Sequence, residues 1–358
     1  GERIVVEIPE EMKKPEPKIE IDALEESYEA KIRNSKPDFY HKGNSGLCSY
    51  YESPLRFPEG IDRSFGLKFR MQINDEFLSS LLVNNLHVIA ASRSGCVYFA
   101  DRFDGVFCDK INFPGETFEK TGTVHSNTVY VNSPAKIFRI NDQNGLMHDE
   151  VYASGQGTYI WSSLNRKGSH LIFTEHNTSE RTGRITAVDI NTGNVISSPN
   201  IRDFAGEQIC SQGSHAFSVY RNKLAVMNTD TLGGTVHELN IDCGEAPFVF
   251  TMNNRLYATT LSNELYYLDL PAANYMFRNT GIRNTFMNSA AGFADNIFIG
   301  TQEGWKCYKS SGLEIFSFED EYENKIEAVN RSLLIISEAA KPLQPFQQGA
   351  DEELHKAG

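Results

Sequence analysis

The sequence has no run of 18 or more apolar residues, so it contains no segment long enough to form a transmembrane helix. Basic residues are in the minority: 34 lysines and arginines stand against 47 aspartates and glutamates, which gives a net charge of −13. Because binding to phosphates requires clustered lysine and arginine, this balance argues against a nucleic-acid partner. The chain opens at Gly1 without a methionine, and we expect a processed or truncated protein.

Motifs that would identify an enzyme or a metal site are also missing from the sequence. It contains no GxSxG elbow, no HExxH pair and no phosphate-binding Walker loop. The acidic runs at 319–321 and 351–353 are typical of solvated surface. We therefore predict no catalytic residue, no metal ligand set and no cofactor.

The six cysteines form no CxxC pair, which excludes the usual zinc-binding and thioredoxin-like arrangements. Cys96 and Cys108 lie on the two arms of a predicted hairpin, so a disulfide between them is one alternative. Buried free thiols are the other.

What the sequence does contain is a repeat, in which a tight polar turn introduces a short apolar strand. Seven such strands begin at residues 86, 128, 170, 223, 255, 296 and 332. The intervals are 42, 42, 53, 32, 41 and 36 residues, and a four-stranded propeller blade takes roughly 40–50 residues. The repeat therefore predicts an all-β, seven-bladed β-propeller of four-stranded blades, with eight blades as the less favoured count.

A second marker follows each of the first six strands: an alternating strand ends in an Asp or Asn turn that reaches a glycine. The clearest copy is Gly183–Ile196, in which Asp189 precedes Gly193. Asp bonds back to its local backbone, and glycine accepts the positive φ of a tight turn. The copy that we assign to the fourth blade is Gly234–Asn240 with Gly244.

Gly183–Ile196 resembles the form G-x-V-x-A-x-D-x-x-T-G-x-V of the PQQ-like (quinoprotein-type) repeat propellers, which include the BamB-like proteins. Asp38–Gly46 resembles the D-W-x-x-x-R-G-N opening of that family, and Leu67–Ile73 its L-x-W strand. The resemblance covers about residues 37–340 and implies a periplasmic or cell-surface location. It does not extend to the quinone enzymes, because the chain has no adjacent cysteine pair and only two tryptophans, Trp161 and Trp305.

The domain organisation follows from the repeat. Residues 1–36 are an extension with a short helix over Asp22–Ile32, which either docks on the propeller or tethers it to a lipid anchor or another domain. Residues 37–345 form the propeller and 346–358 a polar tail. The strand at 67–73 precedes the first repeat, and we expect it to complete the seventh blade so that no sheet edge is left open.

Polar residues on the innermost strands would line the central funnel, and they are the candidate ligand-binding residues. They are His125, Trp161, Ser162, Ser163 and His215. Trp161 would be the stacking floor of a ligand or simple packing between blades. His125 and His215 are expected two blades apart, where a hydrogen-bonded structural role competes with metal binding.

Three functions remain open. The first is a non-catalytic scaffold that binds a protein partner through inter-blade loops, especially residues 174–182 and 197–215. The second is an enzyme or small-molecule binder that uses the funnel. The third is a sensor or anchor module of a larger surface protein.

Overall fold

The computed structural model describes Ile73, Asp75, Ser79 and residues 81–319, with short gaps at 85, 102–104, 126, 143–146, 232, 272–273, 285–286, 288, 294–295 and 302–303. All regular secondary structure in these residues is β-strand, which confirms the predicted all-β class. No helix long and apolar enough to cross a membrane occurs in this described part of the chain.

The strands form six antiparallel sheets in chain order. Sheet 1 holds β1 (Leu82–Val83), β2 (His87–Ala91), β3 (Cys96–Asp101) and β4 (Phe107–Asn112). Sheet 2 holds β5 (Thr123–His125), β6 (Thr128–Asn132), β7 (Lys136–Asn141) and β8 (Met147–Ala153). Sheet 3 holds β9 (Thr158–Ile160), β10 (Asn165–Lys167), β11 (His170–Asn177), β12 (Thr182–Asp189), β13 (Val195–Ser197) and β14 (Ile201–Arg202).

The remaining three sheets have four strands each. Sheet 4 holds β15 (Ile209–Gln212), β16 (His215–Tyr220), β17 (Lys223–Asn228) and β18 (Gly234–Glu238). Sheet 5 holds β19 (Val249–Met252), β20 (Arg255–Thr259), β21 (Glu264–Asp269) and β22 (Arg278–Arg283). Sheet 6 holds β23 (Ser289–Phe293), β24 (Asn296–Gly300), β25 (Gly304–Lys309) and β26 (Glu314–Glu319).

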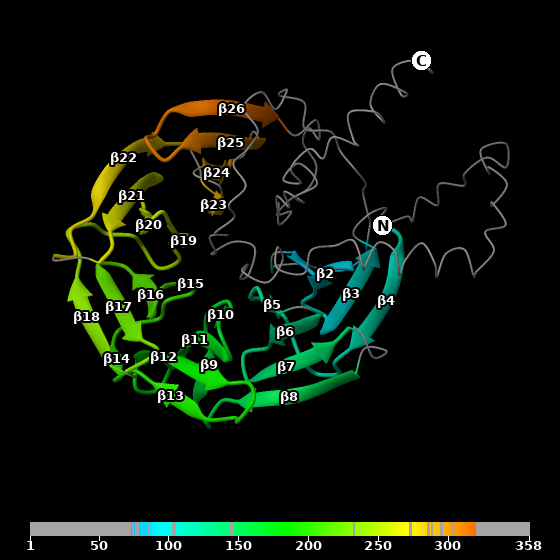
Figure 1. Ribbon diagram of the computed structural model, residues 1–358. Coiled ribbons are helices and arrows are strands. Elements are labelled where there is room, and N and C mark those ends of the chain that lie inside the picture. Colours follow the sequence, from blue (N-terminus) through cyan, green and yellow to red (C-terminus); the bar gives the residue numbers. More distant parts are fainter. Residues whose placement is uncertain are drawn as a thin grey trace, which may run out of the picture. The chain divides into compact units, whose positions relative to one another are not determined.

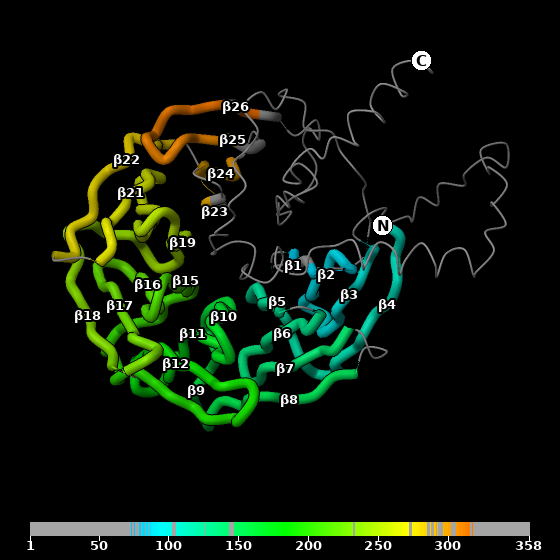
Figure 2. Tube along the Cα trace, viewed as in Figure 1, coloured from blue at the N-terminus to red at the C-terminus, as the bar shows by residue number. Residues whose placement is uncertain are grey.

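Consecutive sheets pack against each other, and Figure 1 shows them following one another along an arc with β5, β10 and β15 on its inner side. The inner strands contact in sequence, from β1 to β5, β10, β15, β19 and β23, a path that the tube in Figure 2 also follows. Five hydrophobic clusters fill the five spaces between neighbouring sheets. Because each cluster draws apolar side chains from two sheets, no sheet could bury its faces alone.

In the five four-stranded sheets the fourth strand is the outer edge, and it is largely exposed in β4, β8 and β18. A β-bulge or irregularity interrupts the pairing of the third strand with the fourth in sheets 1, 2, 5 and 6. Bulges twist an edge and spoil it as a template for another chain. These interruptions therefore protect outer edges that the repeat leaves open.

The predicted repeat strands are confirmed as strands wherever the structure describes them, but one is misplaced within its sheet. Lys223–Val226 belongs to β17, the third strand of sheet 4, whereas the matching second strand is β16, which begins at His215. With 215 in place of 223, the intervals of 53 and 32 become 45 and 40 residues (215 − 170 and 255 − 215). Gly234–Glu238 is accordingly the fourth strand β18, not the third.

The turn chemistry of the repeat is confirmed at its clearest copy. Asp189 Oδ1 accepts hydrogen bonds from the amides of Asn191 and Thr192, both at 2.9 Å, and Gly193 has a φ of 72°. The hydrogen bond from the Ser169 hydroxyl, at 2.6 Å, and then these amide bonds lower the pKa of Asp189 to about 2. The carboxylate therefore stays charged at neutral pH and fixes the hairpin.

The inter-blade loops differ from the prediction, and the closing strand lies outside the described residues. Residues 174–182 and 197–215 are not the inter-blade loops we expected, because Thr174–Asn177 completes β11 and residues 201–202 and 209–212 form β14 and β15. The seventh repeat strand at 332–336 lies outside the described residues, as does the expected closing strand at 67–73 apart from Ile73.

Candidate functional site

Sheet 3 departs from the four-stranded plan at one end. Its two central strands, β11 and β12, have eight residues each, against five or six in the central strands of the other sheets. The extra length pairs with β9 on one side and β14 on the other, whereas the remaining length pairs with β10 and β13. We call the added part, residues 158–160, 174–185 and 201–202, the sheet 3 extension.

Each side of sheet 3 has two short strands with a break between them: β9 and β10 beside β11, and β13 and β14 beside β12. The two breaks lie opposite each other, and a serine hydroxyl bridges each one. Ser162 Oγ accepts a hydrogen bond from the Thr174 amide at 2.8 Å, and Ser198 Oγ accepts one from the Ile185 amide at 3.0 Å. Thr174 and Ile185 are cross-strand partners. The two hydroxyls therefore replace ladder carbonyls and keep buried amides paired where β9 gives way to β10 and β13 to β14.

A buried carboxylate ties the extension to sheet 2. Glu175 is 1% exposed and lies opposite Arg184 in the strand register. Its Oε2 accepts bonds from Arg184 Nε at 2.9 Å and from the Thr186 hydroxyl at 2.7 Å, and its Oε1 accepts one from Tyr152 of β8 at 2.6 Å. Burial, and then the bond to Glu175, raise the pKa of Tyr152, so its hydroxyl remains a donor.

The extension exposes aromatic and arginine side chains on both of its faces. Tyr159 lies in the same register row as Ile201, and Arg202 lies in the next row, so their side chains point to opposite faces of the sheet. Tyr159 is 41% exposed, and the side chains of Arg181 and Arg202 are 77% and 87% exposed. Trp161 is half-buried against the ring of His176, at 5.1 Å between ring centroids. Tyrosine, tryptophan and arginine are the residues most enriched at binding hot spots between proteins.

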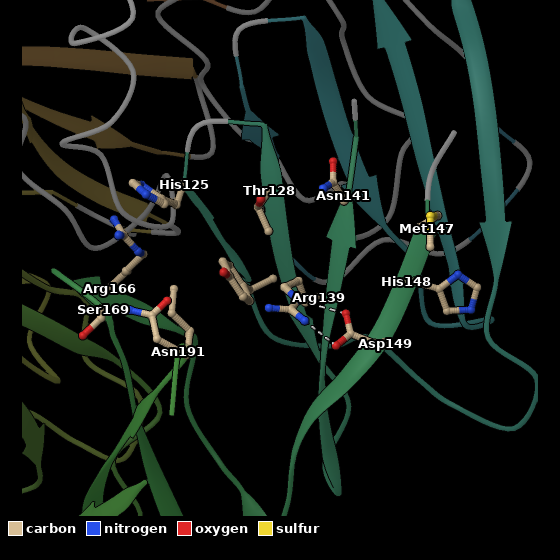
Figure 3. A pocket seen from close by; sticks show the side chains of 12 residues that line it. His125, Thr128, Arg139, Asn141, Met147, His148, Asp149, Arg166, Ser169 and Asn191 are labelled. Carbon is tan, nitrogen blue, oxygen red and sulfur yellow. Dashed lines mark hydrogen bonds and ion pairs between the residues drawn. The ribbon is translucent and has the colours of Figure 1, made fainter. Parts of the chain in front are cut away.

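At the other end of the sheets, a cavity of about 810 Å³ lies between sheets 2 and 3, a size in the usual range for ligand pockets. Its lining comes from β5 to β8, from β10 and from the turns after β10 and β12. Figure 3 shows His125 and Arg166 pointing toward one another at one side of the cavity and Arg139 bound to Asp149 at the other. That pair is bidentate, with N–O distances of 2.9 and 2.6 Å.

The five residues predicted to line one funnel fall into different environments. His125 ends β5 and lines the cavity. Ser162 and Ser163 are buried in the break of sheet 3, where the Ser163 amide donates to the Glu207 carbonyl at 3.1 Å. His215 begins the second strand of its sheet instead of an innermost strand, and its ring lies 6.2 Å from that of Phe217.

His125 and His215 do lie two sheets apart, as expected, and Trp305 is on the third strand β25. Within the described ranges no group of three or more His, Cys, Asp or Glu side chains is placed to hold a metal ion. Cys96 and Cys108 are both free thiols, so the disulfide alternative is wrong for that pair. In the register, Cys96 lies opposite Asn112.

No pattern in the sequence indicates a role for Arg166, Arg139 or Glu175. Each becomes notable only through a partner or a neighbour on another strand or sheet. The sequence does contain a signal for the pairing of Glu175 with Arg184. The two residues come opposite each other when the arms of the hairpin are aligned with residues 174–177 taken as strand.

No family model matches the chain, and no curated protein matches it. Among solved structures, it is similar to BamB from Moraxella catarrhalis, with 14% identity and a TM-score of 0.50 over 70% of this chain and 76% of that one. It is also similar to the computationally designed Ika8 protein, with 13% identity and a TM-score of 0.56 over 73% of this chain and 79% of that one. A third similar structure is U3-55K, with 9% identity and a TM-score of 0.55 over 70% of this chain and 83% of that one.

At these identities the likeness concerns the fold alone. The sheets and the similar structures together support a BamB-like β-propeller fold. Membership of the PQQ-like repeat family stays a prediction from the repeat.

Proposed function

We propose that this protein is a non-catalytic β-propeller scaffold that binds a protein partner through the sheet 3 extension. The observation that carries the proposal is the departure of sheet 3 from the repeat. Five sheets keep four strands, while sheet 3 alone among the described sheets has six and adds ordered, hydrogen-bonded surface.

The exposed residues on the two faces of the extension support the same conclusion. Tyr159, Arg181 and Arg202 are exposed on strands or a strand-adjacent turn. Side chains on a hydrogen-bonded sheet lose less conformational freedom on binding than side chains on a long loop. The buried Glu175 network anchors the extension to sheet 2 and so pre-organises the surface.

Affinity capture with matched variants tests the proposal. The intact protein and the double variant Tyr159→Ser/Arg202→Glu are used as bait against extracts of the source cells. A control variant, Val236→Ser/Arg278→Glu, changes an exposed apolar residue and an exposed arginine on sheets 4 and 5, where Val236 is 43% exposed.

We expect a protein that the parent and the control recover equally and that the extension variant recovers about tenfold less, as loss of one or two hot-spot contacts implies. Equal recovery by all three baits would refute the extension as the contact surface. A parent that enriches nothing specifically would refute the scaffold function.

We further propose that the ring has seven blades, with the strand at 67–73 completing the last, and that the protein acts outside the cytoplasm. The support is the seventh repeat strand at 332–336 and the resemblance of the repeats to exported propellers. Deletion of residues 62–74 should abolish cooperative unfolding, because an unclosed ring leaves open edges. A deletion variant that melts like the parent would exclude this closure.

A further inference from the structure

The cavity between sheets 2 and 3 carries a charge opposite to that of the chain. Two arginines, Arg139 and Arg166, line it beside a single carboxylate, Asp149. The ring of His148 instead lies 4.8 Å from that of Phe113, on the side of β8 that faces sheet 1. The whole chain has a net charge of −13. A concave site that gathers cationic groups in an acidic protein concentrates anions locally.

Arg166 is the central cation of this site. It lies on β10, an inner strand, and burial lowers its pKa, which means that its charged form is poorly solvated there. The guanidinium nevertheless keeps its proton at any physiological pH. A carboxylate in the cavity would add a charge-assisted contact to this guanidinium.

We propose that this cavity binds a carboxylate group, with Arg166 and Arg139 as its cationic contacts. The planar fork of an arginine matches the two oxygens of a carboxylate, and Asp149 already occupies Arg139 in that geometry. Asp149 therefore shows how the incoming group is held and also competes with it.

The rest of the lining fits an organic acid or an acidic side chain better than a bare inorganic anion. Tyr130 offers a hydroxyl, and burial raises its pKa so that it remains a donor. Met147 and Ile190 supply apolar surface for the carbon chain that carries the carboxylate.

Titration of the intact protein with two probes, followed by NMR, tests the proposal. Succinate represents a free small carboxylate, and an acetylated, amidated triglutamate peptide represents an acidic segment of a protein. Equal affinity for the two assigns the site to small carboxylates, and about tenfold tighter binding of the peptide assigns it to an acidic peptide.

Two variants change the affinity in opposite directions. Arg166→Gln should weaken binding about tenfold or more, because a charge-assisted contact is lost. Asp149→Asn should strengthen binding about threefold to tenfold, because it releases Arg139 and removes a repelling charge. Arg221→Gln changes an exposed arginine in the turn between β16 and β17; it is the matched control and should leave affinity unchanged.

Three results would overturn the proposal: no saturable binding of either probe, equal effects of Arg166→Gln and Arg221→Gln, or weaker binding by Asp149→Asn. If Arg166→Gln fails to fold, the Asp149→Asn result decides the question alone. Neither variant touches the sheet 3 extension, so the outcome is separate from that of partner capture.

Discussion

Sheets 3 and 4 are neighbours built from the same repeat, yet they differ in what their central strands do. In sheet 4, β16 and β17 share one burial pattern, four buried residues between two half-buried ends. In sheet 3, β11 and β12 continue past the core and carry Glu175, Arg184 and His176 into the extension. The residues that follow the repeat thus form the core, and the additional residues of the sheet 3 extension form a surface.

Sheets 3 and 4 also differ in the polar groups that they bury. The cluster between sheets 4 and 5 is apolar and includes the thiols of Cys210 and Cys243. The extension instead buries the Glu175 carboxylate, and the breaks beside it bury two serine hydroxyls, all of them hydrogen-bonded. Buried polar networks specify one geometry when every member is satisfied and become costly when one is removed. The extension should therefore be the more fragile region.

The largest effect is expected at Glu175. Glu175→Ala leaves the Tyr152 hydroxyl and the Arg184 guanidinium without their shared acceptor, and it should lower the free energy of unfolding by about 3 kcal/mol. The matched change in sheet 4 is Glu238→Ala, which removes an exposed acceptor of Asn222 and should cost less than about 0.5 kcal/mol. Urea denaturation of both variants measures the difference, and equal costs would remove the contrast between the sheets.

A smaller effect is expected at the breaks in sheet 3. Ser162→Ala leaves the buried Thr174 amide without an acceptor, which should cost about 1–3 kcal/mol in the free energy of unfolding. Ser262→Ala, an exposed serine that donates to Glu264, should change it by less than about 0.5 kcal/mol. If thermal or urea unfolding shows both variants equally stable, the hydroxyl does not bridge the break.

The smallest effect is a difference in the reactivity of the cysteine thiols, and it leaves the stability of the fold unchanged. In a Cys48→Ser background, Cys108 on the exposed outer strand of sheet 1 should react with a maleimide at pH 8 within minutes. Burial raises the pKa of Cys243 and of Cys307 to about 12, so in the folded protein neither forms appreciable thiolate at that pH. Mass spectrometry after labelling measures this, and modification of Cys243 as fast as Cys108 would show that the core between sheets 4 and 5 opens.

The same raised pKa values predict the response to alkaline pH. The folded state holds these protons, while the unfolded chain releases them near 9.0, the ordinary pKa of a cysteine thiol. The contribution of the thiols to stability is therefore complete below that pH and is lost as the pH rises toward 12.

Much of the fold could be predicted from sequence because each repeat combines an apolar strand with turn residues of definite chemistry. The error in sheet 4 has a physical reason: β16 and β17 are equally apolar and equally buried, so periodicity cannot rank them. Only the spacing distinguishes them, and the intervals of 45 and 40 residues favour His215 over Lys223.

The candidate sites were much harder to predict. Thr174–Asn177 is polar and looks like a loop, yet pairing with β12 and β9 makes it strand. The sequence predicts Ser162 as a funnel residue, whereas its hydroxyl accepts a hydrogen bond from the backbone of β11. Arg166 and Arg139 meet in one cavity only because two sheets pack face to face, and a single sequence contains no sign of that.

Site-specific photo-crosslinking tests the central claim most directly. A photoreactive amino acid replaces Tyr159 in the sheet 3 extension or, as the control, Val236 on sheet 4, which is exposed to the same degree. We predict that in source-cell extracts the probe at 159 forms a discrete covalent adduct with a partner protein and that the probe at 236 does not. Adducts of equal yield at both positions, or none at 159, would contradict the account.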